Sequence, residues 1–420
     1  MTTVRRAAAA LAATAVLCTA GAGLAAPVAA AAPSPAPSPA LPKGLYGTGD
    51  PTYDGVWRQS LAFIAQHSVG IEPARPAVDW LMAQQCDSGA FASYRPDPSK
   101  TCDPKTLLDT NATAVALQAL AGTERQPAVK GKPSDPVTVA FKSAVNWLKG
   151  VQNADGGWGY SPGSPSDANS TSIVVGAFAA VGEKPGDVTS KTGKTPYDAL
   201  LGFAIPCADT SGPGAFAYQP DKTGKLYANA DATAAAALAG LGKGILAGNV
   251  KPQQNPSCED KTPQTVDRAA LNGASYLAAA LAKTGHLNAP PMPGAADTTP
   301  QPDFGNTADA VVALGASGHT KEAAGALAWL EQNAPAWAKT SGPAAYAQLI
   351  FAAKAMGADP HKFGHTDLVE ALNATGPAPQ GPETTGNHAE DESSFNVWWI
   401  IGIGTVVGVG IGFLLSGRKK

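Results

Sequence analysis

The chain has 420 residues, and its 30 Lys and Arg against 33 Asp and Glu give a formal net charge of −3. This balance leaves no excess of positive charge for a phosphate backbone, so the sequence argues against nucleic acid as a partner. Apolar residues make up 44% of the chain, whereas Gly (46) and Pro (36) are unusually frequent. The composition therefore predicts an Ala-rich folded body with many loops.

The N-terminal residues 1–32 are typical of a secretory signal peptide. Arg5 and Arg6 precede a stretch of small apolar residues, and the run from Ala29 to Ala32 fits an A-x-A cleavage site. We expect cleavage after Ala32, which removes Cys18. The Pro-, Ala- and Ser-containing segment 33–43 is predicted to be a semi-extended linker.

A charge-free apolar run at 397–415 lies near the C-terminus, with acidic residues before it and a basic tail, 416–420, after it. At about 1.5 Å per residue, the run just spans a hydrocarbon core of about 30 Å. Trp398 and Trp399 suit the membrane interface, and the basic tail should stay cytoplasmic. The sequence predicts a single-pass plasma-membrane protein whose extracellular body is joined to the membrane by a polar stalk, 374–396. A buried core helix is the alternative interpretation.

Four cysteines remain in the mature body: Cys86, Cys102, Cys207 and Cys258. In an exported chain they indicate two disulfides, with three connectivities open. We favour Cys86–Cys102 and Cys207–Cys258, because each pair brackets one loop-rich stretch. None has a C-x-x-C spacing, so no zinc or redox site is predicted.

Helical patterns fill residues 44–373 and repeat with a period of about sixty residues. Four Ala-rich segments begin with polar clusters at 109–113, 167–171, 229–233 and 306–309, and we expect these clusters to cap helices. Asn111, Asn169 and Asn373 also match the glycosylation sequon, which is the alternative interpretation. No long alternating strand pattern occurs. The twelve predicted helices lie at about 57–66, 78–81, 111–120, 141–151, 169–178, 197–203, 229–238, 271–281, 307–314, 323–330, 344–356 and 363–372.

The most specific local motif follows the predicted helix 141–151. Gln152 precedes Gly156, which permits a sharp backbone reversal, and Trp158 can fold back under the helix ends. A weaker copy occupies 85–94, and a third, at 214–218, keeps only the end of the pattern.

This Gln-x-x-x-Gly-x-Trp string resembles the Gln-Trp motif of the prenyltransferase and squalene/oxidosqualene cyclase repeat superfamily. The resemblance covers residues 44–373 and implies an all-α fold, an (α/α)6 toroid of six helical hairpins, to which the C-terminal transmembrane helix is added. The implied inner helices start near Trp57, Asn111, Asn169, Asn229, Thr307 and Ala344.

The catalytic signatures of the superfamily are not found. The chain has no Asp-x-Asp-Asp acid motif, no zinc-ligand set and no catalytic triad, so no metal and no covalently bound cofactor are predicted. Asp109, Asp167 and Asp231 begin inner helices at one end of the implied ring, and an enzyme would use them as acids. We interpret them instead as helix caps.

The sequence therefore favours a non-catalytic binding protein that presents a small ligand to a membrane importer. Export, disulfides and the implied ring resemble the cobalamin carriers of the superfamily, transcobalamin and intrinsic factor, so cobalamin is a candidate ligand. The chain lacks an obvious second β domain to close over it. A terpenoid cyclase or prenyltransferase-like enzyme and an envelope scaffold or adhesion protein are the alternatives. Aromatic rings at loop positions are the predicted ligand contacts: Tyr94, Trp158, Tyr160, Tyr218, Tyr227 and Phe304.

Overall fold

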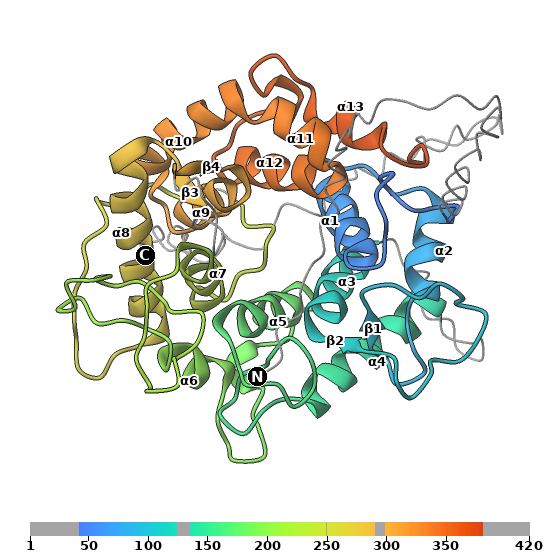
Figure 1. Cartoon of the computed structure of the whole chain (residues 1–420), viewed down its shortest axis with the longest axis horizontal. Coiled ribbons are helices and arrows are strands. Elements are labelled where there is room, and N and C mark those ends of the chain that lie inside the picture. Colours follow the sequence, from blue (N-terminus) through green and yellow to red (C-terminus); the bar gives the residue numbers. More distant parts are fainter. Residues whose placement is uncertain (1–41, 124–134, 249, 290–298, 381–420) are drawn as a thin grey trace, which may run out of the picture. The chain divides into compact units, whose positions relative to one another are not determined.

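The computed structural model of the chain describes residues 42–123, 135–248, 250–289 and 299–380 (Figure 1). The predicted signal peptide, most of the linker, most of the stalk, the membrane span and the basic tail lie outside these residues. None of the helices in the described ranges is long and apolar enough to cross a membrane.

Helices dominate the described residues, so the fold is all-α, as predicted. The α-helices are α1 (Gly55–Ser68), α2 (Arg75–Ala83), α3 (Thr110–Gly122), α4 (Pro136–Gly150), α5 (Ala168–Ala180), α6 (Pro196–Leu201), α7 (Ala230–Gly240), α8 (Val266–Thr284), α9 (Phe304–Ala316), α10 (Thr320–Asn333), α11 (Pro335–Ser341), α12 (Pro343–Ala355) and α13 (Leu368–Asn373). Two 3-10 helices are η1 (Pro185–Asp187) and η2 (Pro360–Lys362). The strands β1 (Phe91–Ala92) and β2 (Leu108–Asp109) form one antiparallel pair, and β3 (Leu287–Ala289) and β4 (Gln301–Asp303) form another.

Six helices pack against one another in a closed circuit. α1 contacts α3, and the order continues through α5, α7, α9 and α12, which returns to contact α1. Figure 1 shows these helices around a common centre, with the others outside them. α2 packs on α1, α4 on α3, α6 on α5, α8 on α7 and α10 on α9, while α11 and α13 pack on α12. We call the six helices of the circuit the inner helices.

The inner helices are buried on nearly all sides. In α7, Ala232, Ala236 and Ala239 have no exposed surface, and neither does Thr233. A helix with neighbours all around it needs apolar residues around its whole circumference, so it shows no single apolar stripe. Alanine also lets neighbouring helix backbones approach closely, which explains why these segments are Ala-rich.

The inner helices begin close to their predicted starts, whereas α4 and α8 each begin five residues earlier than predicted. The short helix α11 was not predicted; it follows α10 directly, and Pro335 at its first position suits a helix start. The last predicted helix, 363–372, is shorter in the structure. Phe363 pairs with Thr366 as an isolated bridge and Gly364 has a φ of +60°, so α13 begins only at Leu368.

Three of the four predicted polar clusters cap inner helices, and the prediction for the cluster at 306–309 was wrong. In each case the side chain of the cap accepts a hydrogen bond from the backbone N–H three residues later, which satisfies a free donor of the first turn. The pairs are Asp109 with Ala112 (2.9 Å), Asp167 with Ser170 (2.6 Å), Asn229 with Ala232 (2.9 Å) and Asp303 with Asn306 (3.0 Å). In the fourth segment the cap is thus Asp303, and the cluster that begins at Asn306 lies inside the helix.

A threonine four residues after each cap ties the helix to the loop before it. Its Oγ1 accepts a hydrogen bond from a backbone N–H of that loop, and all four threonines are fully buried. The donors are Phe91 to Thr113 (2.9 Å), Trp158 to Thr171 (3.1 Å), Phe216 to Thr233 (2.9 Å) and Leu287 to Thr307 (2.9 Å). The repeat therefore consists of a loop, a cap and an inner helix held by one recurring bond.

The Gln152–Trp158 loop is packed from both sides. Gln152 Nε2 donates to the Gly156 carbonyl (2.7 Å), and Trp158, only 1% exposed, donates from Nε1 to the Leu148 carbonyl at the end of α4 (2.8 Å). Gly156 has a φ of +93°, and a Cβ there would lie 2.1 Å from the Thr195 carbonyl oxygen. Only glycine fits this backbone conformation and this contact.

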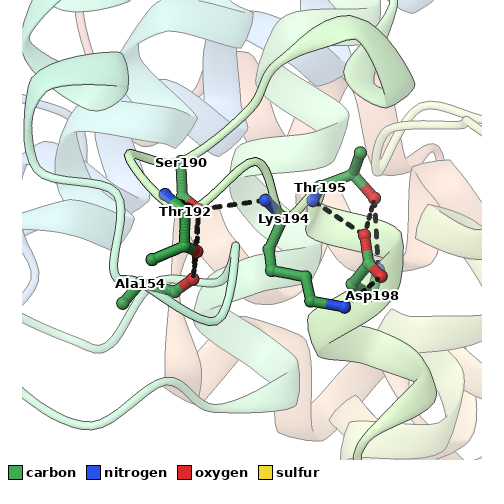
Figure 2. Close-up of polar contacts among 6 residues, drawn as sticks. All are labelled: Ala154, Ser190, Thr192, Lys194, Thr195 and Asp198. Carbon is green, nitrogen blue, oxygen red and sulfur yellow. Dashed lines mark hydrogen bonds and ion pairs between the residues drawn. The ribbon is translucent and has the colours of Figure 1, made fainter.

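The segment that leads into α6 holds the same loop from the other side (Figure 2). The Ala154 carbonyl accepts hydrogen bonds from the hydroxyls of Ser190 (3.0 Å) and Thr192. Thr195 and Asp198 then form a capping box that starts α6. The loop thereby joins one hairpin of helices to the next.

Both predicted disulfides are present, Cys86–Cys102 and Cys207–Cys258. The start of the predicted stalk, 374–380, lies against the body. The Thr375 carbonyl accepts from the Gly47 N–H (2.8 Å), and Gln380 Nε2 donates to the Pro73 carbonyl (2.8 Å). The last described residues therefore pack against the first ones.

Candidate functional site

A cavity of about 510 Å³ lies among the inner helices. Its volume is within the range of about 300–1,000 Å³ that is usual for small-molecule sites. All six inner helices contribute to its wall, through Leu61 of α1, Ala112 of α3, Ile173 of α5, Leu238 of α7, Val312 of α9 and Phe351 of α12. The cavity is thus a property of the closed circuit and not of any one pair of helices.

One end of the cavity is lined by the segment that follows α7. Lys243, Gly244 and Ile245 line it there. The Ile245 N–H donates to Gln118 Oε1 near the end of α3 (3.4 Å), and Lys243 Nζ donates to the Ala316 carbonyl at the end of α9 (2.5 Å). These partners lie at the C-terminal ends of the inner helices, so we call this end the floor.

The N-terminal ends of the inner helices form the opposite end, which we call the mouth. Its lining includes Asp109, Asn111, Tyr160, Asn169 and Asp231. Asp109 accepts from Ser93 Oγ (2.9 Å) as well as from the backbone that it caps. The mouth is therefore polar, whereas the wall below it is mostly apolar.

Asp309, in the second turn of α9, lines the cavity below the mouth. Burial raises the pKa of Asp309 to about 7, and the charges of Asp231 and Asp303 add to the rise. Gln348 Nε2 on α12 donates to both carboxylate oxygens of Asp309, at 3.4 and 3.2 Å, and these hydrogen bonds oppose the rise in its pKa. Asp309 therefore changes its charge near neutral pH.

Asp231, in the first turn of α7, is the second acid of this region. Its Oδ2 accepts a hydrogen bond from Asn169 Nδ2 on α5 (2.6 Å). Burial raises the pKa of Asp231, the Asn169 bond opposes the rise, and the charge of Asp303 adds to it. The two inner helices α5 and α7 thus meet at a charged hydrogen bond on the cavity surface.

Three residues that line the cavity each have a buried side-chain oxygen without a hydrogen-bond partner: Asn111 Oδ1, Asn169 Oδ1 and Ser172 Oγ. Ser172 is only 5% exposed. Buried polar atoms normally have partners, because leaving one unpaired costs about 1–3 kcal/mol. These three oxygens therefore leave hydrogen-bonding capacity unused within the residues that line the cavity.

The predicted aromatic contacts are dispersed in the structure. Tyr160 lines the cavity, and burial raises its pKa, opposed by a bond with Ser93 and reinforced by the neighbouring Asp109. Trp158 is buried below the loop. Phe304 stacks on Trp329 and Trp337, with ring centroids 5.0 and 5.5 Å away. Tyr94, Tyr218 and Tyr227 are not among the residues that line the cavity.

The acids of the alternative enzymatic interpretation are also divided. Asp109 and Asp231 line the cavity, whereas Asp167 does not. Asp167 caps α5 and interacts with the hydroxyl of Tyr218, and burial raises its pKa. The described residues contain no group of three or more His, Cys, Asp or Glu side chains that could hold a metal ion.

Sequence reasoning missed Asp309 as a site residue, although the repeat contains the signal for it. The residue two positions after the cap lines the cavity in three repeats, as Asn111, Asn169 and Asp231 do. One helical turn further on, a residue lies on the same face. That position is Asp309 in α9, six residues after its cap Asp303.

No family model matches the chain, and neither does any curated protein. Among solved structures, a protein from Actinoplanes is similar to it, with 18% identity over 75% of this chain and 79% of that one and a TM-score of 0.43.

Proposed function

We propose that this protein binds a small organic ligand in the cavity of an (α/α)6 toroid and does not transform it. The observation that carries the proposal is the cavity of about 510 Å³, which is lined by all six inner helices and, at their C-terminal ends, by the floor. The Gln152–Trp158 loop and the repeated caps support a relationship to the prenyltransferase and squalene cyclase repeat superfamily.

The location that we propose is the outer face of the plasma membrane. Two disulfides suit an oxidising compartment, which agrees with the predicted signal peptide. The predicted span at 397–415 would hold the body at the surface, where it could pass the ligand to a membrane importer.

Cobalamin remains a candidate for this ligand, with a restriction that comes from size. The cavity suits a drug-sized molecule, and a corrinoid with its nucleotide loop is much larger. A corrinoid would therefore place only a part of itself inside the ring and leave the rest at the mouth, where a separate protein could cover it.

Binding is tested with the full chain in detergent micelles. Equilibrium dialysis measures retention of cobalamin, and a fluorescence titration measures binding of N-acetylated dansylcadaverine, an uncharged probe of drug-like size.

Ala235 lines the cavity, so Ala235→Trp should fill it and weaken binding of the probe at least about tenfold. Ala324→Trp places the same ring on the exposed face of α10 and should leave binding unchanged. No retention of cobalamin at micromolar concentration removes the corrinoid version, and failure to bind cobalamin, this probe or a charged derivative of it contradicts a ligand-binding function.

The second candidate function is that of an enzyme that uses acid catalysis, and the raised pKa of Asp309 favours it. A carboxyl group that retains its proton near neutral pH beside an apolar wall can act as a general acid. This candidate predicts conversion of squalene without a metal ion, or of a prenyl diphosphate with Mg²⁺, and loss of turnover in Asp309→Asn. Unchanged substrate after prolonged incubation would contradict it.

A further inference from the structure

We propose that the mouth of the cavity binds the ammonium group of an organic amine, whose apolar part lies against the wall below. This proposal rests on the proposed ligand-binding function and adds the chemical class of the ligand. It is carried by the polar atoms that the inner helices present to one region of the cavity.

The polar groups of this region are mostly hydrogen-bond acceptors. The carboxylates of Asp231 and Asp309 line it from α7 and α9. Asn111, Asn169 and Ser172, each with one unpartnered side-chain oxygen, line it from α3 and α5. The orientation of the Asn169 amide follows from its Nδ2, which already donates to Asp231 and leaves Oδ1 as the free end. These oxygens lack a partner with several hydrogen-bond donors, and an ammonium group supplies three N–H donors.

Some acids of the mouth already have partners within the protein. Asp109 and Asp303 cap α3 and α9 through backbone N–H groups, and Asp54 pairs with Arg58 at 2.8 Å. Asp231 and Asp309 make no ion pair among the described residues, and their bonds come from the neutral amides of Asn169 and Gln348. They are therefore the carboxylates that are available to a ligand.

Among the described residues that line the cavity, none supplies a cation at the mouth. Lys243 is the only Lys or Arg among the described residues that line the cavity, and it donates to Ala316 at the floor. Ala316 lies seven residues after Asp309 in the same helix, which corresponds to about 10 Å along the axis. No lysine or arginine that lines the cavity therefore offsets the electrostatic repulsion among Asp231, Asp303 and Asp309.

The apolar wall distinguishes an organic amine from other donors. Ala234, Leu238 and Val312 line the cavity below the acids, and Phe351 lines it from α12. A hydrated metal ion would gain nothing from this surface, and an uncharged polyol would not offset the carboxylate charge. An amine with an apolar body satisfies both parts of the site.

The test compares probes that differ only in charge. Dansylcadaverine carries a primary ammonium group, its N-acetyl derivative is neutral, and dansyl-aminohexanoate is anionic. With the full chain in detergent micelles at pH 8, we expect dansylcadaverine to bind at least about tenfold more tightly than the neutral probe, and the anionic probe to bind most weakly. Asp231→Asn and Asp309→Asn should each bring the affinities of the cationic and neutral probes closer together. Asp79→Asn removes an exposed acid of α2 and should preserve the difference.

The outcomes separate this inference from the function on which it rests. Equal affinity for the cationic and neutral probes, or a preference that survives in both cavity variants, overturns the inference and leaves ligand binding intact. Binding of none of the three probes overturns both. Calcium or magnesium chloride that displaces dansylcadaverine at micromolar concentration would also overturn the inference, because the acids would then form a metal site.

Discussion

Asn169 on α5 donates a hydrogen bond to the Asp231 carboxylate on α7, with 2.6 Å between Nδ2 and Oδ2. Each residue stands two positions after the cap of its own helix, so the repeat brings them together at the mouth. The bond stabilises a charge that burial disfavours, and it opposes the rise in the pKa of Asp231.

Replacement of Asn169 by Ala should therefore destabilise the protein when Asp231 is charged. We expect a loss of about 1–3 kcal/mol at pH 8 and a smaller loss at acidic pH, because protonation of Asp231 removes the charge that the amide stabilises. Urea unfolding at the two pH values measures the difference. Asn333→Ala, at an exposed position of α10, should change the stability by less than about 0.5 kcal/mol. An equal loss at both pH values would contradict this explanation.

Asp309 predicts a specific dependence of stability on pH. Its pKa is about 7 in the folded protein and 3.8 ordinarily, so between about pH 4 and pH 7 the folded chain keeps a proton that the unfolded chain has lost. The contribution of Asp309 is present below pH 4 and is lost as the pH rises through 7.

Asp309→Asn removes this loss while keeping an acceptor for Gln348. The free energy of unfolding of the variant relative to the native chain should rise between pH 4 and pH 8 by at least about 1 kcal/mol and at most about 4. The neighbouring acids Asp231 and Asp303 remain in both proteins, so the comparison isolates Asp309. Parallel stability curves would show that Asp309 titrates normally.

The Gly156 loop should tolerate no side chain. Gly156→Ala combines a φ of +93° with a Cβ only 2.1 Å from the Thr195 carbonyl oxygen. We expect a loss of more than about 2 kcal/mol, because the added Cβ would push the loop away from the Thr195 carbonyl. Gly163→Ala is the matched control: its φ is +79° with no atom within 4 Å of the added Cβ, so it should lose only about 1 kcal/mol. Equal losses in the two variants would mean that backbone conformation alone decides.

The recurring threonine should contribute through its hydroxyl. Thr171→Val keeps the shape but removes the acceptor of the Trp158 N–H, which leaves a buried donor unpaired. A loss of about 1–3 kcal/mol is expected, with faster hydrogen exchange of that amide. Thr223→Val, on an exposed turn, serves as the control. Unchanged exchange at Trp158 would contradict the proposed role of this bond.

Local patterns made much of this fold predictable. The caps at Asp109, Asp167 and Asn229 and the loop around Gly156 are local features, and their spacing located the inner helices. The two disulfides followed because each pair encloses one loop-rich stretch. The sequence pattern did not predict α11, because this helix is short and continues directly from α10.

The site was harder to predict because the cavity depends on which helix face turns inward. Trp158 appeared suited to a ligand, but the same ring fills the space below a helix end, and the sequence does not distinguish these two uses. Asp309 seemed one polar residue among several in its segment. Only the closed circuit places it beside Asp231, and only burial there raises its pKa.

A crystal structure of the chain with dansylcadaverine would show directly whether the cavity binds an organic amine. We expect the dansyl group among the inner helices, with the ammonium nitrogen at hydrogen-bond distance, about 3 Å, from the carboxylate of Asp231 or Asp309. A probe bound only on the outer helices, with an empty ring, would contradict it.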